Sequence, residues 1–282
     1  MLEPTVDVSG EVAKTTSRIH FVMSTATQAS ESALAHHQAG RIAEAAALYQ
    51  QVLQADPGHV DALHLLGVAA HQSGQHDVAL QCISKAIGLR GGDAAIHANL
   101  GEVCCALGKL DEAARCFQQA ARLDPGGVHR HLRLGDVYLA QQKLDQAESA
   151  YQEASRLQPE HAEVHERLGM LRHEAGDTAQ AVAHFEEALQ RDPKLARAYD
   201  RLAASLHKQG RLAEAVDCYR RGLEHHPQAA TLHFGLGVTY QGLRLYDKAV
   251  TSYRTSIELQ SRNAMAHNNL GVALKELGQL DG

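Results

Sequence analysis

The 282-residue sequence contains no tryptophan, only four phenylalanines and only six prolines. So few large aromatic rings argue against an aromatic cage or a platform for stacking bases. The five cysteines are odd in number and form no CxxC pair, so we expect small, partly buried thiols in a reducing compartment. The net charge of −6 argues against a protein that follows nucleic-acid phosphates, which requires clustered lysine and arginine.

Signals for catalysis and targeting are also missing. The sequence has no GxxxxGK phosphate loop, no HExxH helix and no serine in a GxSxG turn, so we expect no enzyme activity and no cofactor in these residues. The N-terminus lacks the basic start and apolar run of a signal peptide, and no later stretch is apolar enough to cross a bilayer. These absences predict a cytoplasmic protein that binds neither nucleic acid nor membrane.

What the sequence does contain is a pattern that recurs every 34 residues. Its clearest copy, LGEVCCALGKLDEAARCFQQAARLDP, runs from Leu100 to Pro125. Five of the six prolines fall at one position of this pattern: Pro57, Pro125, Pro159, Pro193 and Pro227. A fixed period of this size indicates a repeat array, in which chain length measures the number of repeats rather than the number of domains.

Each repeat predicts two helices, because apolar or small residues recur at spacings of three and four over positions 1–14 and again over 16–30. A glycine near position 15 and the proline at position 32 are expected to end them. A small residue at position 8, such as Gly135, should let the helices approach, and a large residue at position 24, such as Tyr151, should fill the gap. At position 15, Gln142 and Arg244 replace the glycine.

The frame places a flexible leader over residues 1–25 and the array over residues 26–282. Its units are 26–59, 60–93, 94–127, 128–161, 162–195, 196–229, 230–263 and a partial 264–282. Because the chain stops where the next second helix should begin, we expect it to be a fragment of a longer protein.

This pattern of Leu-Gly, alanine, aromatic, alanine and proline resembles the tetratricopeptide repeat (TPR), over residues 26–282. The resemblance implies an all-α fold, a right-handed superhelical solenoid of helix-turn-helix repeats. It also implies a concave groove, lined by the first helices, that binds an extended peptide or a partner helix. The last copy, AMAHNNLGVALKELGQLD, is similar to repeats of O-linked N-acetylglucosamine transferases and Spindly proteins.

Candidate groove residues share one face of the first helices. They are Asn99, Glu102, Arg133, Asp136, Glu166, Arg167, His173, Asp200, Arg201, His207 and Asn269. In one interpretation Arg133 pairs with Glu166, and Arg167 with Asp200, in surface ion pairs worth about 0–1 kcal/mol each. In the other, the arginines form a ladder that holds the carboxylates of a peptide. The two interpretations are compatible, and the groove histidines would make binding sensitive to pH.

Histidine is abundant, with 19 copies. One group shares position 4, where we expect a structural role: His97, His131, His165, His233 and His267. Histidines at one position of adjacent repeats should lie about 10 Å apart, which is the ordinary distance between packed helices. Two such histidines cannot both ligate one metal at about 2 Å, so we expect no metal site.

The sequence supports two hypotheses of function. In the first, the chain is a non-catalytic scaffold that binds a peptide or partner protein in its groove. In the second, it is the substrate-recruiting arm of a larger glycosyltransferase or sulfotransferase whose catalytic domain lies beyond residue 282. The asparagine ladder that the transferase resemblance implies is mostly absent, since only Asn99 and Asn269 occupy that position and arginine replaces the others. Oligomeric state is not predicted.

Overall fold

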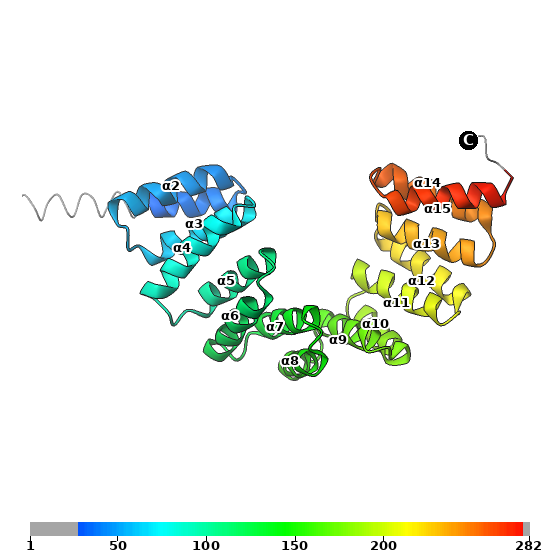
Figure 1. Cartoon of the computed structure of the whole chain (residues 1–282), viewed down its shortest axis with the longest axis horizontal. Helices are drawn as coiled ribbons and strands as arrows, with labels where there is room; N and C mark the ends of the chain where they lie inside the picture. The colour runs from blue at the N-terminus through cyan, green and yellow to red at the C-terminus, as the bar shows by residue number, and fades with distance from the viewer. Residues whose placement is uncertain (1–27, 279–282) are drawn as a thin grey trace, which may run out of the picture. The chain divides into compact units, whose positions relative to one another are not determined.

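The computed structural model describes residues 28–278, and within this range the chain is helical and contains no β-strand. A helix over residues 28–38 comes first. It is followed by α2 (Ile42–Ala55), α3 (Val60–Gln72), α4 (His76–Leu89), α5 (Ala94–Ala106), α6 (Leu110–Leu123), α7 (Val128–Ala140), α8 (Leu144–Leu157), α9 (Ala162–Glu174), α10 (Thr178–Arg191), α11 (Ala196–Lys208), α12 (Leu212–His225), α13 (Ala230–Gly242), α14 (Tyr246–Leu259) and α15 (Ala264–Glu276) (Figure 1). The predicted all-α class is confirmed. The predicted leader lies outside the described residues.

The chain divides into two compact units, one up to Arg130 and one from His131 on, so the boundary falls inside α7. In the first unit α3 packs on α4 and α5 on α6; in the second α9 packs on α10, α11 on α12 and α13 on α14. Contacts of α4 with α5, α10 with α11 and α12 with α13 join successive pairs within a unit. Each unit is therefore a stack of helix pairs, as the repeat predicts. None of the helices within residues 28–278 is both long and apolar enough to cross a bilayer.

In the described helix pairs, the turn that joins the two helices contains a residue in the left-handed conformation. The glycines Gly40, Gly74, Gly108, Gly176, Gly210 and Gly278 have φ between 71° and 83°. Gln142 and Arg244 replace glycine at this position, and both are held at a φ of 59°. This conformation strains a residue that has a Cβ and so costs free energy, whereas glycine adopts it without strain.

Replacing Arg244 with glycine should therefore stabilise the protein by up to about 1 kcal/mol, because the left-handed turn loses its Cβ strain. The matched reverse change is Gly210→Ala, where an added Cβ would have no atom within 4 Å, so only the backbone conformation is tested. That change should destabilise the protein by a similar amount. Urea unfolding of both variants measures the two effects, and a less stable Arg244→Gly protein would contradict the argument.

In five of the described helix pairs, a large side chain of the second helix lies against a glycine of the first, and in α11–α12 the small residue at this position is Ala203. A Cβ built on Gly135 would lie 2.3 Å from Cε1 of Tyr151, far inside van der Waals contact. The same test places Gly67 against Ile83, Gly101 against Phe117, Gly169 against Phe185 and Gly237 against Tyr253. The predicted packing of position 8 against position 24 is confirmed.

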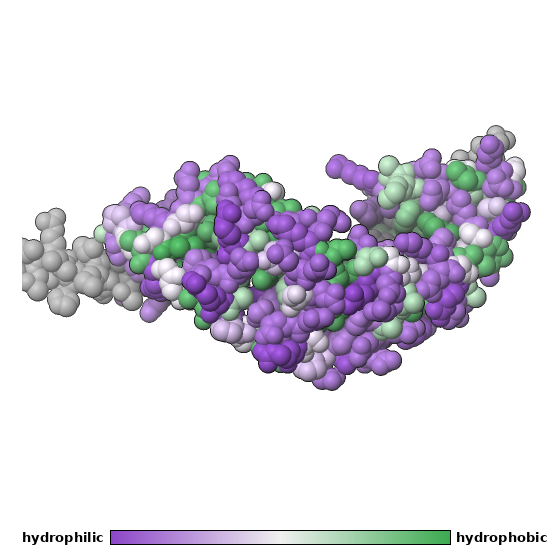
Figure 2. All heavy atoms as spheres, turned by 60° about the horizontal axis from the view of Figure 1, so that its bottom comes forward, coloured by the Kyte–Doolittle hydropathy of each residue, from purple (hydrophilic) through white to green (hydrophobic). Residues whose placement is uncertain are grey.

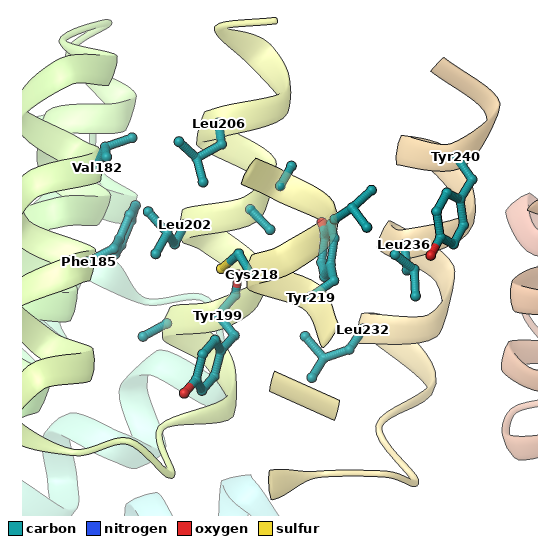
Figure 3. Packing of buried hydrophobic residues seen from close by; sticks show 14 of the residues in the cluster. Val182, Phe185, Tyr199, Leu202, Leu206, Cys218, Tyr219, Leu232, Leu236 and Tyr240 are labelled. Carbon is teal, nitrogen blue, oxygen red and sulfur yellow. Dashed lines mark hydrogen bonds between the residues drawn. The ribbon is translucent and has the colours of Figure 1, made fainter. Parts of the chain in front are cut away.

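Buried side chains of α10 to α15, in the second unit, form one connected core (Figure 3). Phe185 of α10 faces Leu202 of α11, and Tyr219 of α12 lies between α11 and Leu236 of α13. The buried thiol of Cys218 donates to the backbone oxygen of Tyr199 at 3.5 Å, which agrees with the expected role of a small buried cysteine. Figure 2 shows hydrophilic residues over most of the visible face of each unit, with hydrophobic patches between them.

We expect Gly135→Ala to destabilise the protein by about 1–3 kcal/mol, because the added methyl group forces the ring of Tyr151 to move. Gly271→Ala is the matched control at the same repeat position of α15, where an added Cβ meets nothing within 4 Å. That control should be neutral or stabilising by up to about 1 kcal/mol, since alanine favours a helix more than glycine does. Thermal unfolding distinguishes the two variants. Equal effects would show that the close approach does not govern stability.

The histidines at position 4 tie the loop before each first helix to that helix. In four units the ring Nε2 lies 2.8–3.0 Å from the backbone oxygen six residues earlier. The pairs are His97 with Gly91, His165 with Pro159, His233 with Pro227 and His267 with Ser261. A carbonyl oxygen only accepts, so each Nε2 carries the hydrogen. The structural role expected for this group is confirmed in these units.

Candidate functional site

A cluster of charged side chains on α7, α9 and α11 surrounds the carboxylate of Glu166, which is 0% exposed. The Glu166 oxygens lie 3.0 Å from Nη1 of Arg167 and 3.3 Å from Nη2 of Arg197. Nε of Arg201 is 3.7 Å from the same carboxylate. A buried charge is stable only when it is paired, so Glu166 holds these arginines in place and is not itself open to a ligand. We call these four residues the Glu166 cluster.

Arg167 joins this cluster to α7. Its Nε lies 2.7 Å from Oδ1 of Asp136, and its side chain is only 11% exposed. Asp136 also accepts a hydrogen bond of 2.8 Å from the hydroxyl of Tyr151 and lies 3.3 Å from Nη1 of Arg133. Burial first, and then the charge of Asp136, raise the pKa of Tyr151, so this hydroxyl stays protonated and donates. Arg167 and Asp136 are thus fixed parts of the site.

The cross-repeat pairing that we expected has the opposite direction. The sequence suggested Arg167 with Asp200 of the next unit, whereas the structure places Arg167 against Asp136 of the preceding unit. Arg201 likewise approaches Glu166 of the preceding unit, and Arg133 contacts Asp136 within its own helix. Spacing along one helix defines its face, but it does not say which of two neighbouring helices a long side chain reaches.

Two arginines of the Glu166 cluster remain open to solvent, since the side chains of Arg197 and Arg201 are 55% and 42% exposed. Both line a pocket of about 420 Å³, together with Asp136, Arg167 and Glu174. In this group the guanidinium groups of Arg133, Arg167, Arg197 and Arg201 contact the carboxylates of Asp136 and Glu166. Arg197 also lies 3.7 Å from Glu163, and Glu174 lines the pocket, so four carboxylates balance the four guanidinium groups, of which those of Arg197 and Arg201 reach the solvent beside the pocket.

Two further pockets lie along the same face of the second unit. One, of about 310 Å³, is lined by Asp200, Ala204, His207, Tyr219, Thr231, Phe234, Gly235, Val238 and Thr239. The other, of about 480 Å³, is lined by His207, Val238, Gln241, Gly242, Arg244, Tyr246, Tyr253, Asn269, Val272 and Glu276. His207 lines both, and Asp200 is the chain neighbour of Arg201, so the three pockets are consecutive. We call them the first-helix pockets.

The structure thus brings most of the predicted groove residues of the second unit to these pockets. Asp136, Arg167 and Arg201 line the first pocket, Asp200 and His207 the second, and His207 and Asn269 the third. His173 of α9 contacts α11, with its Nδ1 3.3 Å from Oγ of Ser205. Asn269 hydrogen-bonds Tyr253, whose hydroxyl donates to Gln241 at 2.8 Å.

Asn99 and Glu102 belong to the first unit. The side-chain amide nitrogen of Asn99 lies 2.7 Å from Nε2 of His64. Burial of the imidazole lowers the pKa of His64, which favours the neutral ring that can accept from this amide. The sequence missed Arg197, which lies at position 2 on the face already identified. The signal for it was its spacing of four residues from Arg201 on α11, which places both on one side of the helix.

Burial raises the pKa of Asp200, while Arg201 and a hydrogen bond from Tyr219 lower it by less. The folded state therefore holds this proton more tightly than the unfolded chain does. The ionised carboxylate lowers stability above its folded pKa, and the loss disappears as the pH falls below about 4, the ordinary pKa of aspartate.

Asp200→Asn keeps an oxygen that accepts from Tyr219 but carries no charge. We expect this variant to be more stable than the wild type at pH 7, with a difference that shrinks toward pH 4. Asp217→Asn, on the exposed side of α12, is the matched control for the loss of one charge. Urea unfolding at both pH values measures the difference. A variant that is less stable at pH 7 would show that the carboxylate is stabilised in its site.

Comparison with family models identifies the repeat. Tetratricopeptide repeat models match residues 36–103, 92–160, 132–196 and 172–237, and a TPR repeat model matches residues 246–278. The chain belongs to the tetratricopeptide repeat family. A comparison with the curated proteins gave no match.

Solved structures agree with this fold. A tetratricopeptide repeat protein from Parabacteroides merdae is 14% identical with a TM-score of 0.74, over 89% of this chain and 99% of that one. PilF from Pseudomonas aeruginosa is 21% identical with a TM-score of 0.62, over 76% and 96% of the two chains. MamA is 25% identical with a TM-score of 0.53, over 57% of this chain and 95% of that one.

Proposed function

We propose that the chain is a non-catalytic interaction scaffold that binds an extended segment of a partner protein along the first-helix pockets. Arg197 and Arg201 bind a carboxylate of that segment. The observation that supports this most directly is the state of the Glu166 cluster. Its buried carboxylate already has Arg167 at 3.0 Å, while Arg197 and Arg201 keep exposed guanidinium groups beside a pocket.

The Glu166 cluster orients these arginines before any ligand arrives. A long side chain that is held in place loses less entropy on binding than a free one. Guanidinium groups also match a carboxylate geometrically, because each can donate two parallel hydrogen bonds. The cluster therefore favours an acidic residue or a chain terminus of the partner over a neutral residue.

The second of the first-helix pockets suggests which kind of residue lies next to the carboxylate in the partner. Phe234 and Val238 of α13 and Ala204 of α11 contribute apolar surface to it. An apolar side chain placed there would lose contact with water, which is the usual core of a protein interface beside a charged rim. The proposed ligand is thus an acidic residue close to an apolar one.

The recruiting-arm hypothesis stays a prediction, because it concerns a catalytic domain beyond residue 282. Such an arm would use the same surface, so the proposal for the pockets holds under either hypothesis. The cytoplasmic location also stays a prediction.

An array of ten-residue peptides that combine glutamate or aspartate with leucine or phenylalanine tests the proposal. We expect the full chain to retain a subset of these peptides, and to retain none of the matched peptides in which lysine replaces the acid. Binding should weaken as salt rises, because exposed charges are screened. In the double variant R197A/R201A the affinity for retained peptides should fall at least about tenfold, the ratio that 1.4 kcal/mol produces.

The matched control is R220A/R254A, which removes the same charge from exposed positions on α12 and α14. It should bind as the wild type does, and circular dichroism should show equal helix content in both double variants. The proposal fails if the array retains acidic and basic peptides equally. It also fails if both double variants lose affinity to the same extent.

A further inference from the structure

A second group of polar side chains lies in the second unit, apart from the first-helix pockets. His165 of α9 and His184 and Glu187 of α10 each offer a ligand atom, and these atoms lie within 4.8 Å of one another. His165 is only 7% exposed, while His184 and Glu187 are half-buried. Two helices that pack directly on each other therefore present two imidazoles and one carboxylate to one point.

The hydrogen bond of His165 determines which of its nitrogens is free. Its Nε2 donates to the backbone oxygen of Pro159 at 2.8 Å, so in the neutral ring Nδ1 carries a lone pair and no hydrogen. A histidine that binds a metal usually donates its other ring N–H to a carbonyl or carboxylate in this way, which orients the ring. His165 thus has the orientation of a metal ligand before any metal is bound.

The lone pair of His165 faces another acceptor. Its Nδ1 lies 3.2 Å from Oε2 of Glu187, and this buried nitrogen makes no hydrogen bond within residues 28–278. The buried Nδ1 of His184 is also without a hydrogen-bond partner in the described structure. Two electron-rich atoms at this distance repel each other unless a proton or a metal cation lies between them, and a proton on His165 would leave Nδ1 of His184 without a partner. A cation shared by the three side chains would satisfy all three atoms.

The repeat frame shows that the arrangement belongs to one unit. His97 and His233 make the same hydrogen bond at position 4 as His165 does. The two positions that His184 and Glu187 occupy carry Cys116 and Gln119 in one of those units and Ser252 and Thr255 in the other. The repeat thus supplies an oriented histidine several times, and the unit 162–195 alone adds a histidine and a carboxylate to it.

Positive neighbours of the group already have their own partners. Nη2 of Arg191 lies 2.9 Å from Oε1 of Glu187, and its Nε is 3.4 Å from Glu160. Arg172, whose positive charge interacts with His184, is paired with Glu148 of α8. Glu187 therefore offers Arg191 one oxygen and keeps Oε2 for the imidazoles. These pairs reduce the repulsion that a bound cation would meet.

We propose that His165, His184 and Glu187 form a site for a divalent transition-metal cation of the zinc type. Two imidazole nitrogens and one carboxylate oxygen are a common donor set for zinc, with water as the fourth ligand. Ligand atoms about 2.0–2.1 Å from a tetrahedral ion lie roughly 3.3 Å apart, which the His165–Glu187 pair already matches. The bound ion would link α9 to α10 and, through Pro159, to the loop that precedes α9.

The full chain, freed of metal with a chelator and titrated calorimetrically with zinc chloride, tests this site. We expect one equivalent of zinc to bind, and the same ion to raise the thermal unfolding temperature because it binds only the folded state. In His184→Ala and Glu187→Gln the affinity should fall at least about tenfold, the effect typical of removing a ligand or its support. Both variants keep the hydrogen bond of His165, so the loop before α9 is left intact.

Two controls address the other candidate ligands of the chain. His76→Ala breaks the pair in which Nδ1 of His71 and Nδ1 of His76 lie 3.2 Å apart, and Cys116→Ser alters a thiol that hydrogen-bonds Cys104. Both should bind zinc as the wild type does. The proposal is overturned if no equivalent binds, if binding is unchanged in His184→Ala and Glu187→Gln, or if a control variant loses the site instead.

Discussion

The contact between a glycine of one helix and an aromatic or isoleucine side chain of the next is the constraint on which the rest of this structure depends. A Cβ at Gly169 would lie 2.6 Å from the ring of Phe185, so the two helices pack at a distance that no larger residue permits. Repetition of this contact makes each helix pair nearly the same. Identical pairs stack in register, and the exposed face of each first helix is then free to vary.

The Glu166 cluster and the group formed by His165, His184 and Glu187 use these variable positions in different ways. Glu166 and Arg201 lie on first helices, where neighbouring pairs bring charges of adjacent units together. His165, by contrast, meets His184 and Glu187 within one pair, across the packed helices α9 and α10. One surface is built between repeats and the other inside a repeat. The repeat 162–195 takes part in both, because it supplies Glu166, which holds Arg197 and Arg201 of the next repeat, and all three proposed metal ligands.

The burial of each charged side chain determines whether a binding partner can reach it. Glu166 is fully buried and Arg167 nearly so, and both are paired with charged neighbours. Arg197 and Arg201 extend from that fixed centre into solvent. The buried members hold the geometry and the exposed members carry the charge that a partner meets. Asp200 is different, because burial raises the pKa of its carboxyl group, and we therefore expect its ionised carboxylate to lower the stability of the fold.

The sequence alone determined the helix pairs, their turns and their internal packing, because these depend on spacings of a few residues that recur in every unit. Gly135, Tyr151 and the left-handed glycines follow from that pattern. It also identified the face that carries Arg201, His207 and Asn269. Tertiary structure alone decided which neighbours meet: Arg167 with Asp136 rather than Asp200, and His165 with His184. The expectation of no metal site compared histidines at equal repeat positions and histidines of one helix. Contacts between unlike positions arise from how two helices pack, and the period of one helix does not contain that information.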